Sequence, residues 1–220
     1  AARPEDARAA FELGNALAAA RRDQEAAEAF QRVVTLRPDV AAAHFNLANA
    51  LLSLSRWDEA VVALEACVAL ETTCEALENL AFAYVQCQRL EPAVETLERA
   101  LGLHPGSTTA RVRLTRLLLA AARRDDAVRT LQSGLELAPH EPDFHAEWAQ
   151  VLQSEGQVAE AIEAWGIAIS LAPDNAEWRI YRSALLQLVG RGAEALQVIH
   201  EGLVRNPEDA KLRQFQSAAR

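Results

Sequence analysis

The residue types that most often perform catalysis are present, but none has the spacing that catalysis or metal binding needs. The nearest approach to a metal motif is His140 and His145, and Pro142 between them interrupts the helical spacing that a zinc site of this kind uses. The chain has no Gly-rich phosphate loop, no nucleophile elbow and no convergent Ser, His and Asp set. We therefore expect no catalytic residues, no metal and no cofactor, and we expect that this chain is not an enzyme.

Cysteines and paired acids favour structural roles. The three cysteines are an odd number, which argues against a secreted fold closed by disulfides and favours a cytoplasmic location. We expect them to be small buried apolar residues. Acidic pairs such as Asp58–Glu59 and Asp125–Asp126 are expected at the starts of helices, where the helix dipole stabilises carboxylates.

Composition limits the class of protein further. The chain has 220 residues, of which 50% are hydrophobic and 24% charged, a balance typical of a folded soluble protein. Its formal charge of −9 argues against general nucleic-acid binding, which depends on a basic surface. No apolar run approaches the roughly 20 residues of a membrane span, so no membrane insertion is expected. The absence of methionine suggests a fragment of a longer chain.

An internal repeat determines the expected fold. Prolines in short turn-like phrases are separated by 67, 34, 34 and 34 residues, where 67 is a doubled period lacking one residue: Pro38, Pro105, Pro139, Pro173 and Pro207. A second series of alanines keeps the same phase, with steps of 34, 33, 34, 34 and 34: Ala26, Ala60, Ala93, Ala127, Ala161 and Ala195. Self-similarity at a fixed period of this length predicts a solenoid of repeated units.

This pattern resembles the tetratricopeptide repeat (TPR) family, whose unit of 34 residues is an antiparallel helix pair. The resemblance implies an all-α fold, a right-handed α-solenoid over residues 1–220 as a single domain. The expected units are 7–40, 41–73, 74–107, 108–141, 142–175 and 176–209, with a partial capping helix at 210–220. The sixth unit departs from the pattern, because Arg182 and Ser183 replace its usual apolar and small residues.

Elementary physics explains the markers. Small residues at the eighth and twentieth positions of a unit let its two helices approach closely. Proline ends the second helix, because it has no N–H donor and disfavours helical geometry in the residue before it. Gly156 and Gly190, each at the fifteenth position, suit the left-handed turn that closes a first helix. Leu212 and Phe215 are expected to cover the exposed face of the sixth unit.

The resemblance also implies where ligands bind, because the family lines a concave groove with its first helices. Positions that should face this groove carry phenylalanines and asparagines in the first three units: Phe11, Asn15, Phe45, Asn46, Asn49, Asn79 and Phe82. An asparagine side chain offers both a donor and an acceptor, the complement of a peptide backbone. The phenylalanines could supply apolar pockets. The alternatives are that they seal gaps between first helices, and that the asparagines are solvated surface.

A local basic spot lies at the next unit. Arg113 and Arg116 are three residues apart, on one face of the expected helix, and guanidinium groups pair well with carboxylates and phosphates. An acidic group of a ligand could therefore dock there, unless Glu147 of the following unit neutralises the arginines.

Two groups within the family have residue patterns that bear on what this surface binds. The carboxylate-clamp subclass, which grips acidic C-terminal tails, needs cations where Phe11, Glu75 and Asn79 stand, so we reject that function for units one to three. The segment 43–51 is more similar to the repeats of O-linked N-acetylglucosamine transferases, which carry an asparagine ladder, although only two of six units keep it here.

Three functions remain open from the sequence. The first is a protein–protein interaction scaffold that holds an extended or helical peptide of a protein partner in the groove. The second is the targeting region of a larger glycosyl-, methyl- or sulfotransferase, whose catalytic domain is absent here. The third is a self-assembling solenoid, in which terminal repeats form a homo-oligomer.

Overall fold

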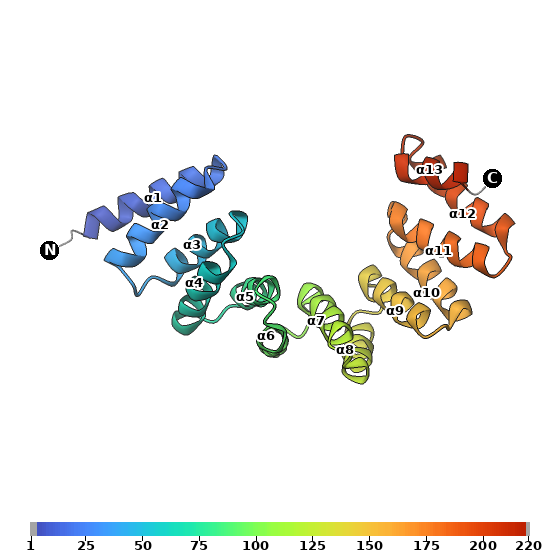
Figure 1. The fold of residues 1–220 in the computed structure, drawn as a ribbon, viewed down its shortest axis with the longest axis horizontal. Coiled ribbons are helices and arrows are strands. Elements are labelled where there is room, and N and C mark those ends of the chain that lie inside the picture. Colours follow the sequence, from blue (N-terminus) through green and yellow to red (C-terminus); the bar gives the residue numbers. More distant parts are fainter. Residues whose placement is uncertain (1–3, 219–220) are drawn as a thin grey trace. The chain divides into compact units, whose positions relative to one another are not determined.

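The computed structural model describes residues 4–218, which form α-helices joined by short turns (Figure 1). Residues 219 and 220 of the expected capping helix lie outside the described residues. The chain divides into two compact units, 1–117 and 118–220, and α7 (Thr108–Ala120) contains the point of division. The prediction of all-α antiparallel helix pairs is confirmed. That all repeats form one solenoid domain stays a prediction.

The first unit contains three packed helix pairs and the first ten residues of α7. The pairs are α1 (Pro4–Ala19) with α2 (Asp23–Leu36), α3 (Ala41–Ser53) with α4 (Trp57–Leu70), and α5 (Cys74–Gln86) with α6 (Leu90–Leu103). The second helices of the first two pairs also pack on the next first helix, α2 on α3 and α4 on α5. The core is therefore continuous through these pairs, as in a stack of repeats.

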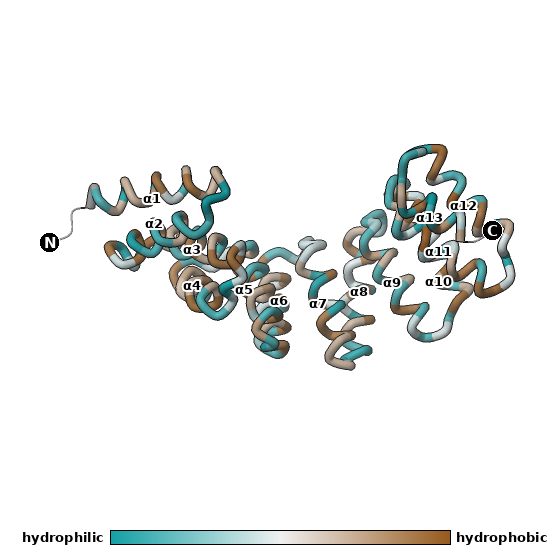
Figure 2. The backbone as a smooth tube through the Cα atoms, turned by 45° about the horizontal axis from the view of Figure 1, so that its top comes forward, coloured by the Kyte–Doolittle hydropathy of each residue, from teal (hydrophilic) through white to brown (hydrophobic). Residues whose placement is uncertain are grey.

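The second unit contains α8 (Arg124–Leu137) and two helix pairs. The pairs are α9 (Pro142–Ser154) with α10 (Val158–Leu171), and α11 (Ala176–Leu188) with α12 (Gly192–Arg205). The last helix, α13 (Ala210–Ala218), packs on α11 and α12. Figure 2 shows hydrophobic and hydrophilic residues alternating along the helices, as expected where one face of each helix is buried.

Small residues hold the helices of each pair together. The alanines at the twentieth position, from Ala26 to Ala195, are all at most 1% exposed, and the residues at the eighth position are buried as well. In the first repeat the eighth residue is Gly14, where an added Cβ would lie 2.7 Å from the ring of the buried Phe30. The aromatic ring therefore occupies the space that a side chain at Gly14 would need.

Two residues after each first helix ends, the fifteenth residue of the repeat has left-handed backbone geometry. The prediction for Gly156 and Gly190 is confirmed, with φ of +73° and +78°. The other four repeats place non-glycine residues there, with φ between 57° and 59°: Arg21, Ser55, Gln88 and Ala122. The turn geometry is the same whichever residue occupies it, so the fold imposes this conformation on side chains that disfavour it.

A further contact, which the sequence did not reveal, ties the proline turns to the following first helix. His44 and His145 each form a hydrogen bond with the carbonyl oxygen of the proline six residues earlier, at 2.9 and 2.8 Å. At the equivalent fourth position, Arg111 donates to the Pro105 carbonyl at 2.6 Å and Arg179 to the Pro173 carbonyl at 3.0 Å. These side chains therefore satisfy carbonyl groups that the turn leaves without a helical partner.

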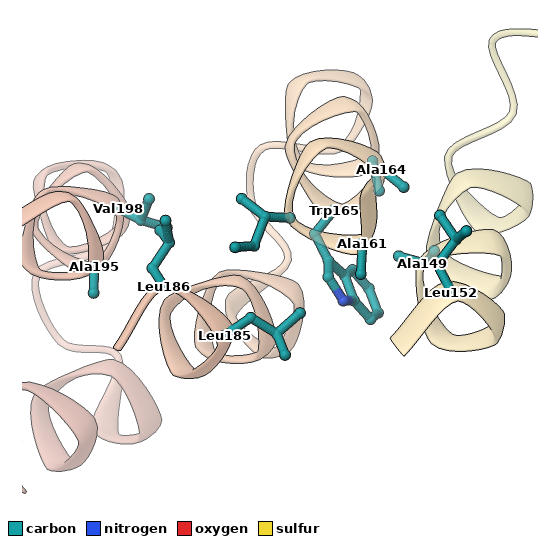
Figure 3. Packing of buried hydrophobic residues seen from close by; sticks show 12 residues of the cluster. Ala149, Leu152, Ala161, Ala164, Trp165, Leu185, Leu186, Ala195 and Val198 are labelled. Carbon is teal, nitrogen blue, oxygen red and sulfur yellow. The ribbon is translucent and has the colours of Figure 1, made fainter. Parts of the chain in front are cut away.

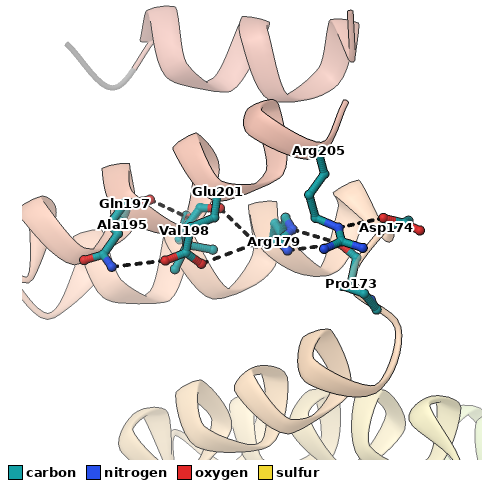
Figure 4. A network of polar contacts seen from close by, with 9 residues as sticks. Pro173, Asp174, Arg179, Ala195, Gln197, Val198, Glu201 and Arg205 are labelled. Carbon is teal, nitrogen blue, oxygen red and sulfur yellow. Dashed lines mark hydrogen bonds and ion pairs between the residues drawn. The ribbon is translucent and has the colours of Figure 1, made fainter. Parts of the chain in front are cut away.

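Of the two departures in the sixth repeat, Ser183 gains a compensating hydrogen bond, whereas the buried Nε of Arg182 has no hydrogen-bond partner among the described residues. Ser183 donates a hydrogen bond of 3.0 Å to the Ala195 carbonyl, so this buried hydroxyl is satisfied. Arg182 lies against Gly166, where an added Cβ would be 3.2 Å from its guanidinium carbon. Arg179 is buried and joins α11 to α12 through the Val198 carbonyl (Figure 4). Burial lowers the pKa of its guanidinium.

The core of the second unit is built around Trp165 of α10. Figure 3 shows its ring between Ala149 and Leu152 of α9 on one side and Leu185 of α11 on the other. At the C-terminal end, α13 packs on α11 and α12, and its role as a cap of the sixth repeat stays a prediction. Leu212 of α13 is buried, and an added Cβ at Gly202 would lie 2.7 Å from its Cδ1 atom.

The turn geometry yields a test in which one substitution has opposite effects at two sites. Gly156→Ala should destabilise the chain by about 1–2 kcal/mol, because alanine disfavours positive φ and no atom lies near enough to clash. Gly102→Ala, in an exposed turn of α6, should instead stabilise it by up to about 1 kcal/mol. Urea denaturation of the two variants measures both changes, and a shift in the same direction would contradict this account of the turn.

Candidate functional site

All nine candidate site residues belong to the first compact unit, on its four first helices. They are Phe11 and Asn15 on α1; Phe45, Asn46 and Asn49 on α3; Asn79 and Phe82 on α5; and Arg113 and Arg116 on α7. Two of these helices begin directly after a residue whose side chain caps the helix N-terminus. Thr73 accepts a hydrogen bond from the Ala76 N–H before α5, and Ser107 accepts one from the Ala110 N–H before α7.

The four asparagines form two pairs, each joining neighbouring first helices. The Asn46 side-chain amide donates to the Asn15 side-chain oxygen at 3.0 Å, from α3 to α1. The Asn79 amide donates to the Asn49 oxygen at 3.0 Å, from α5 to α3. In both pairs the sixth residue of one repeat bonds to the ninth residue of the repeat before it. The asparagines are therefore ordered by one another, with Asn15 exposed and the other three half-buried.

Each pair keeps hydrogen-bonding capacity for a ligand. A side-chain amide has two N–H donors and two acceptor lone pairs, and the contact uses one donor of one residue and one lone pair of the other. The remaining groups of Asn46, Asn49 and Asn79 lie on half-buried residues, so they are partly shielded but accessible. The pairing thus fixes the side-chain orientations in advance of binding.

The same two repeat positions meet again between α5 and α7, with different chemistry. The guanidinium carbon of Arg113 lies 5.9 Å from the centre of the Phe82 ring, within cation–π range. Arg113 also donates to the Glu78 carbonyl at 3.2 Å. The Phe82 ring packs edge-on against Trp57 of α4, with ring centres 5.9 Å apart. The arginine and the aromatic ring therefore hold each other in place.

Beside this pair lies a cavity of about 230 Å³, which we call the α5–α7 cavity. Phe82, Arg113 and Arg116 lie on its wall, together with Ala81, Val85, Gln86, Leu97 and Leu117. Phe82 remains 38% exposed, which is unusual for a large apolar side chain on a helix packed on both sides. The cavity is smaller than the roughly 300–1,000 Å³ of small-molecule sites, so it has room for one or two side chains of a ligand.

The other two candidate phenylalanines line cavities that are equivalent by repeat position. Phe11 packs edge-on against Phe30, with ring centres 5.8 Å apart, and lines a cavity of about 230 Å³ with Val33, Arg8 and Arg37. Phe45 lines a cavity of about 190 Å³ with Cys67, Glu71 and Glu75, which we call the α3–α5 cavity. Both rings are half-buried, so part of each ring remains exposed. The alternative that they only seal gaps between first helices does not account for that exposed part.

The two equivalent cavities differ in charge. At the first, Arg8 is paired with Glu12 and Arg37 with Asp39, so its arginines are neutralised locally. At the α3–α5 cavity, no ion pair with another described residue engages either Glu71 or Glu75. Burial, aided by Glu71, raises the pKa of the Cys67 thiol, so this cysteine is not an activated nucleophile. The cavity therefore carries negative charge and no nucleophilic chemistry.

Sequence reasoning missed several residues that complete these surfaces. Val85, Gln86 and Glu75 occupy positions that the groove assignment includes, but they were not selected because they are neither aromatic nor amide-paired. Leu97 and Leu117 could not be found that way, because they reach the α5–α7 cavity from core positions. Glu147 is a buried residue of the second unit, and the alternative that it neutralises the arginines stays a prediction.

Other kinds of site are not indicated. Among residues 4–218 no group of three or more His, Cys, Asp and Glu side chains is placed to hold a metal ion. None of the described helices has the length and apolar character needed to cross a membrane. The surface with ordered polar groups and apolar cavities is thus the face of the first helices.

Comparison with known families agrees with the repeat architecture. One tetratricopeptide repeat model matches residues 1–41, 24–69 and 146–210, and a second matches residues 88–150. The chain belongs to the tetratricopeptide repeat family. Neither matching model describes an enzyme. No curated protein matches the chain.

Solved structures share the TPR fold at low sequence identity. A tetratricopeptide repeat protein from Parabacteroides merdae is 17% identical with a TM-score of 0.78, covering 98% of this chain and 86% of that one. Pseudomonas aeruginosa pilF is 18% identical with a TM-score of 0.70, covering 97% and 98%. The MamA protein is 18% identical with a TM-score of 0.71, covering 80% and 96%. At this identity the likeness concerns the fold alone.

The asparagine pairs can be tested by a double-mutant cycle on stability. Asn49→Ala and Asn79→Ala should show a coupling of about 0.5–1.5 kcal/mol, because either substitution removes the same hydrogen bond. Asn15→Ala and Asn79→Ala, whose side chains are not bonded to each other, serve as the control pair and should be additive. Additivity in the Asn49 and Asn79 cycle, measured by denaturant unfolding, would show that the contact is absent in solution.

Proposed function

We propose that the first unit is a protein–protein interaction module that binds a peptide segment of a partner along the face of α1, α3, α5 and α7. The observation that carries this proposal is the α5–α7 cavity beside ordered asparagine amides. An apolar side chain of the segment enters the cavity beside Phe82, and the amides of Asn49 and Asn79 bond to its backbone. TPR proteins are interaction modules as a class, and the chain belongs to that family.

The side chains that would bind the segment are already held in place by contacts within the chain, and this supports a binding function. Binding usually loses free energy to the ordering of side chains, by about 0.5–1.5 kcal/mol for each flexible one. Here the amides are already paired, and Arg113 is already held against Phe82 and the Glu78 carbonyl. A partner segment therefore meets groups whose positions are set, so more of the contact energy remains as affinity.

The test uses a neutral probe peptide with blocked ends, in the order glutamine, three glycine or serine residues, phenylalanine and asparagine. Calorimetric titration should detect millimolar or tighter binding. Phe82→Ala should weaken it about tenfold, because the cavity loses its aromatic wall. Asn79→Ala should cost about 0.5–1.5 kcal/mol, whatever side chains the probe carries.

The matched control is Leu188→Ser, which removes an apolar side chain that is 74% exposed on the second unit. It should leave binding of the probe unchanged. Equal weakening by Leu188→Ser and Phe82→Ala would show that the probe adheres to exposed apolar surface in general, and would contradict the proposed site.

A second function, self-association through the N-terminal face, is favoured by one observation. Leu13 is 55% exposed, whereas the equivalent residues Leu47, Leu80 and Leu114 are 4%, 3% and 3% exposed. Within the unit, the second helix of one repeat packs on the first helix of the next, α2 on α3 and α4 on α5. Leu13 and Leu17 line a cavity of about 420 Å³ on this face, which another helix could fill. A transferase-targeting role rests on the sequence resemblance alone.

Self-association predicts a mass that rises with protein concentration in light scattering. Leu13→Glu should return the mass to that of the monomer, because a carboxylate at this position opposes burial of the face. Leu188→Glu, at an even more exposed leucine, should have no effect. A monomeric mass for the unmodified chain at every concentration would exclude this second function.

A further inference from the structure

The α5–α7 and α3–α5 cavities carry opposite charges on one run of first helices. Arg113 and Arg116 stand on the wall of the first, and Glu71 and Glu75 on the wall of the second. Both cavities are lined by residues of α5. The α5–α7 cavity lies near the end of this helix, and the α3–α5 cavity lies at its start. A segment that follows this face therefore meets positive charge at one place and negative charge at another.

We propose that the partner segment is bipolar, with an apolar–acidic residue pair in the α5–α7 cavity and a basic residue in the α3–α5 cavity. This inference rests on the proposed function, and it names the chemistry of the partner that would occupy the site. A uniformly acidic segment would be attracted by the arginines but repelled by the glutamates. A uniformly basic segment would be attracted by the glutamates but repelled by the arginines. Neither kind of segment therefore matches the charges of this face.

The groups at the α5–α7 cavity suit a carboxylate next to an apolar side chain. The Arg113 guanidinium has five N–H donors, of which the Glu78 carbonyl accepts one. Its plane is held near Phe82, so the remaining donors stand beside the apolar cavity without reordering. Arg116 lies on the same wall one helical turn later. A charge-assisted bond formed there is strengthened by partial exclusion of water.

The α3–α5 cavity suits the opposite charge for a separate reason. Its aromatic wall, Phe45, can contact the alkyl stem or the cation of a lysine or arginine side chain. Glu71 and Glu75 flank the same small cavity without a cation of their own among the described residues. A ligand cation in the cavity would be attracted by both carboxylates. At the equivalent cavity beside Phe11, the charged side chains are already neutralised by ion pairs with their own neighbours.

The helix geometry sets the spacing of the two charges. Glu75 and Phe82 are seven residues apart on α5, which is about 10 Å along the helix at 1.5 Å per residue. An extended segment covers about 3.3 Å per residue, so it needs at least roughly three residues to span that distance, and because every second side chain lies on the same face, the shortest step that keeps both side chains on one face is about four residues. The partner should therefore carry its basic residue about four positions from the apolar residue that enters the α5–α7 cavity.

The test compares three end-blocked probes of six residues that differ only in charge. The matched probe has lysine first and phenylalanine–aspartate last, the exchanged probe has aspartate first and phenylalanine–lysine last, and the neutral probe has glutamine and asparagine there. Calorimetry at low salt should rank affinity as matched, neutral and exchanged, with about a tenfold difference between matched and exchanged probes. Raising the salt to about 0.5 M should narrow that difference, because screening lengths shorten.

Charge reversal separates recognition from structural damage. Arg113→Glu should weaken the matched probe at least fivefold more than the neutral probe, and it should improve the exchanged probe relative to the neutral one. Glu75→Lys should do the same from the other cavity. Equal affinity of the matched and exchanged probes, with the neutral probe still bound, would overturn the bipolar partner and leave the proposed function standing. Failure of all three probes to bind would overturn both.

Discussion

The structure depends on the close contact between two small residues within each helix pair. An alanine at the twentieth position faces a glycine, alanine, serine or threonine at the eighth, and every one of these residues is buried. Because the helix axes can approach, the second helix is free to bury its other face against the next pair. Neighbouring first helices are then brought side by side at a fixed repeat spacing. The candidate site is a consequence of that spacing.

Repetition of the backbone does not require repetition of the chemistry. The same contact, from the sixth position of one repeat to the ninth of the repeat before it, is an amide pair twice and a cation–π pair once. The equivalent phenylalanine-lined cavities at Phe11 and Phe45 are neutralised in one repeat and negatively charged in the next. The scaffold supplies equivalent places, and the sequence varies what each one can bind.

The repeat phase made most of the fold predictable. The prolines and alanines at steps near 34 place the helix pairs, and Gly156 and Gly190 indicate the left-handed turns. Four turns with non-glycine residues were not predictable, because propensity there is overridden by the packing around the turn. The hydrogen bonds from His44 and Arg179 to proline carbonyl oxygens could not be predicted either. The repeat pattern indicates that these side chains face the interior, but it does not indicate which acceptor each one bonds.

The candidate site was predictable as a set of positions but not as a set of contacts. The sequence identified Asn49, Asn79, Phe82 and Arg113 as groove residues, whereas the contacts that pair Asn79 with Asn49 and Arg113 with Phe82 required the structure. The central claim is that a partner segment occupies the α5–α7 cavity. Methyl NMR of the chain titrated with the matched probe tests it most directly. The account predicts saturable shifts of the Val85, Leu97 and Leu117 methyl groups and none for Leu186 and Val198 in the second unit. Shifts confined to the second unit, or spread evenly over both, would contradict it.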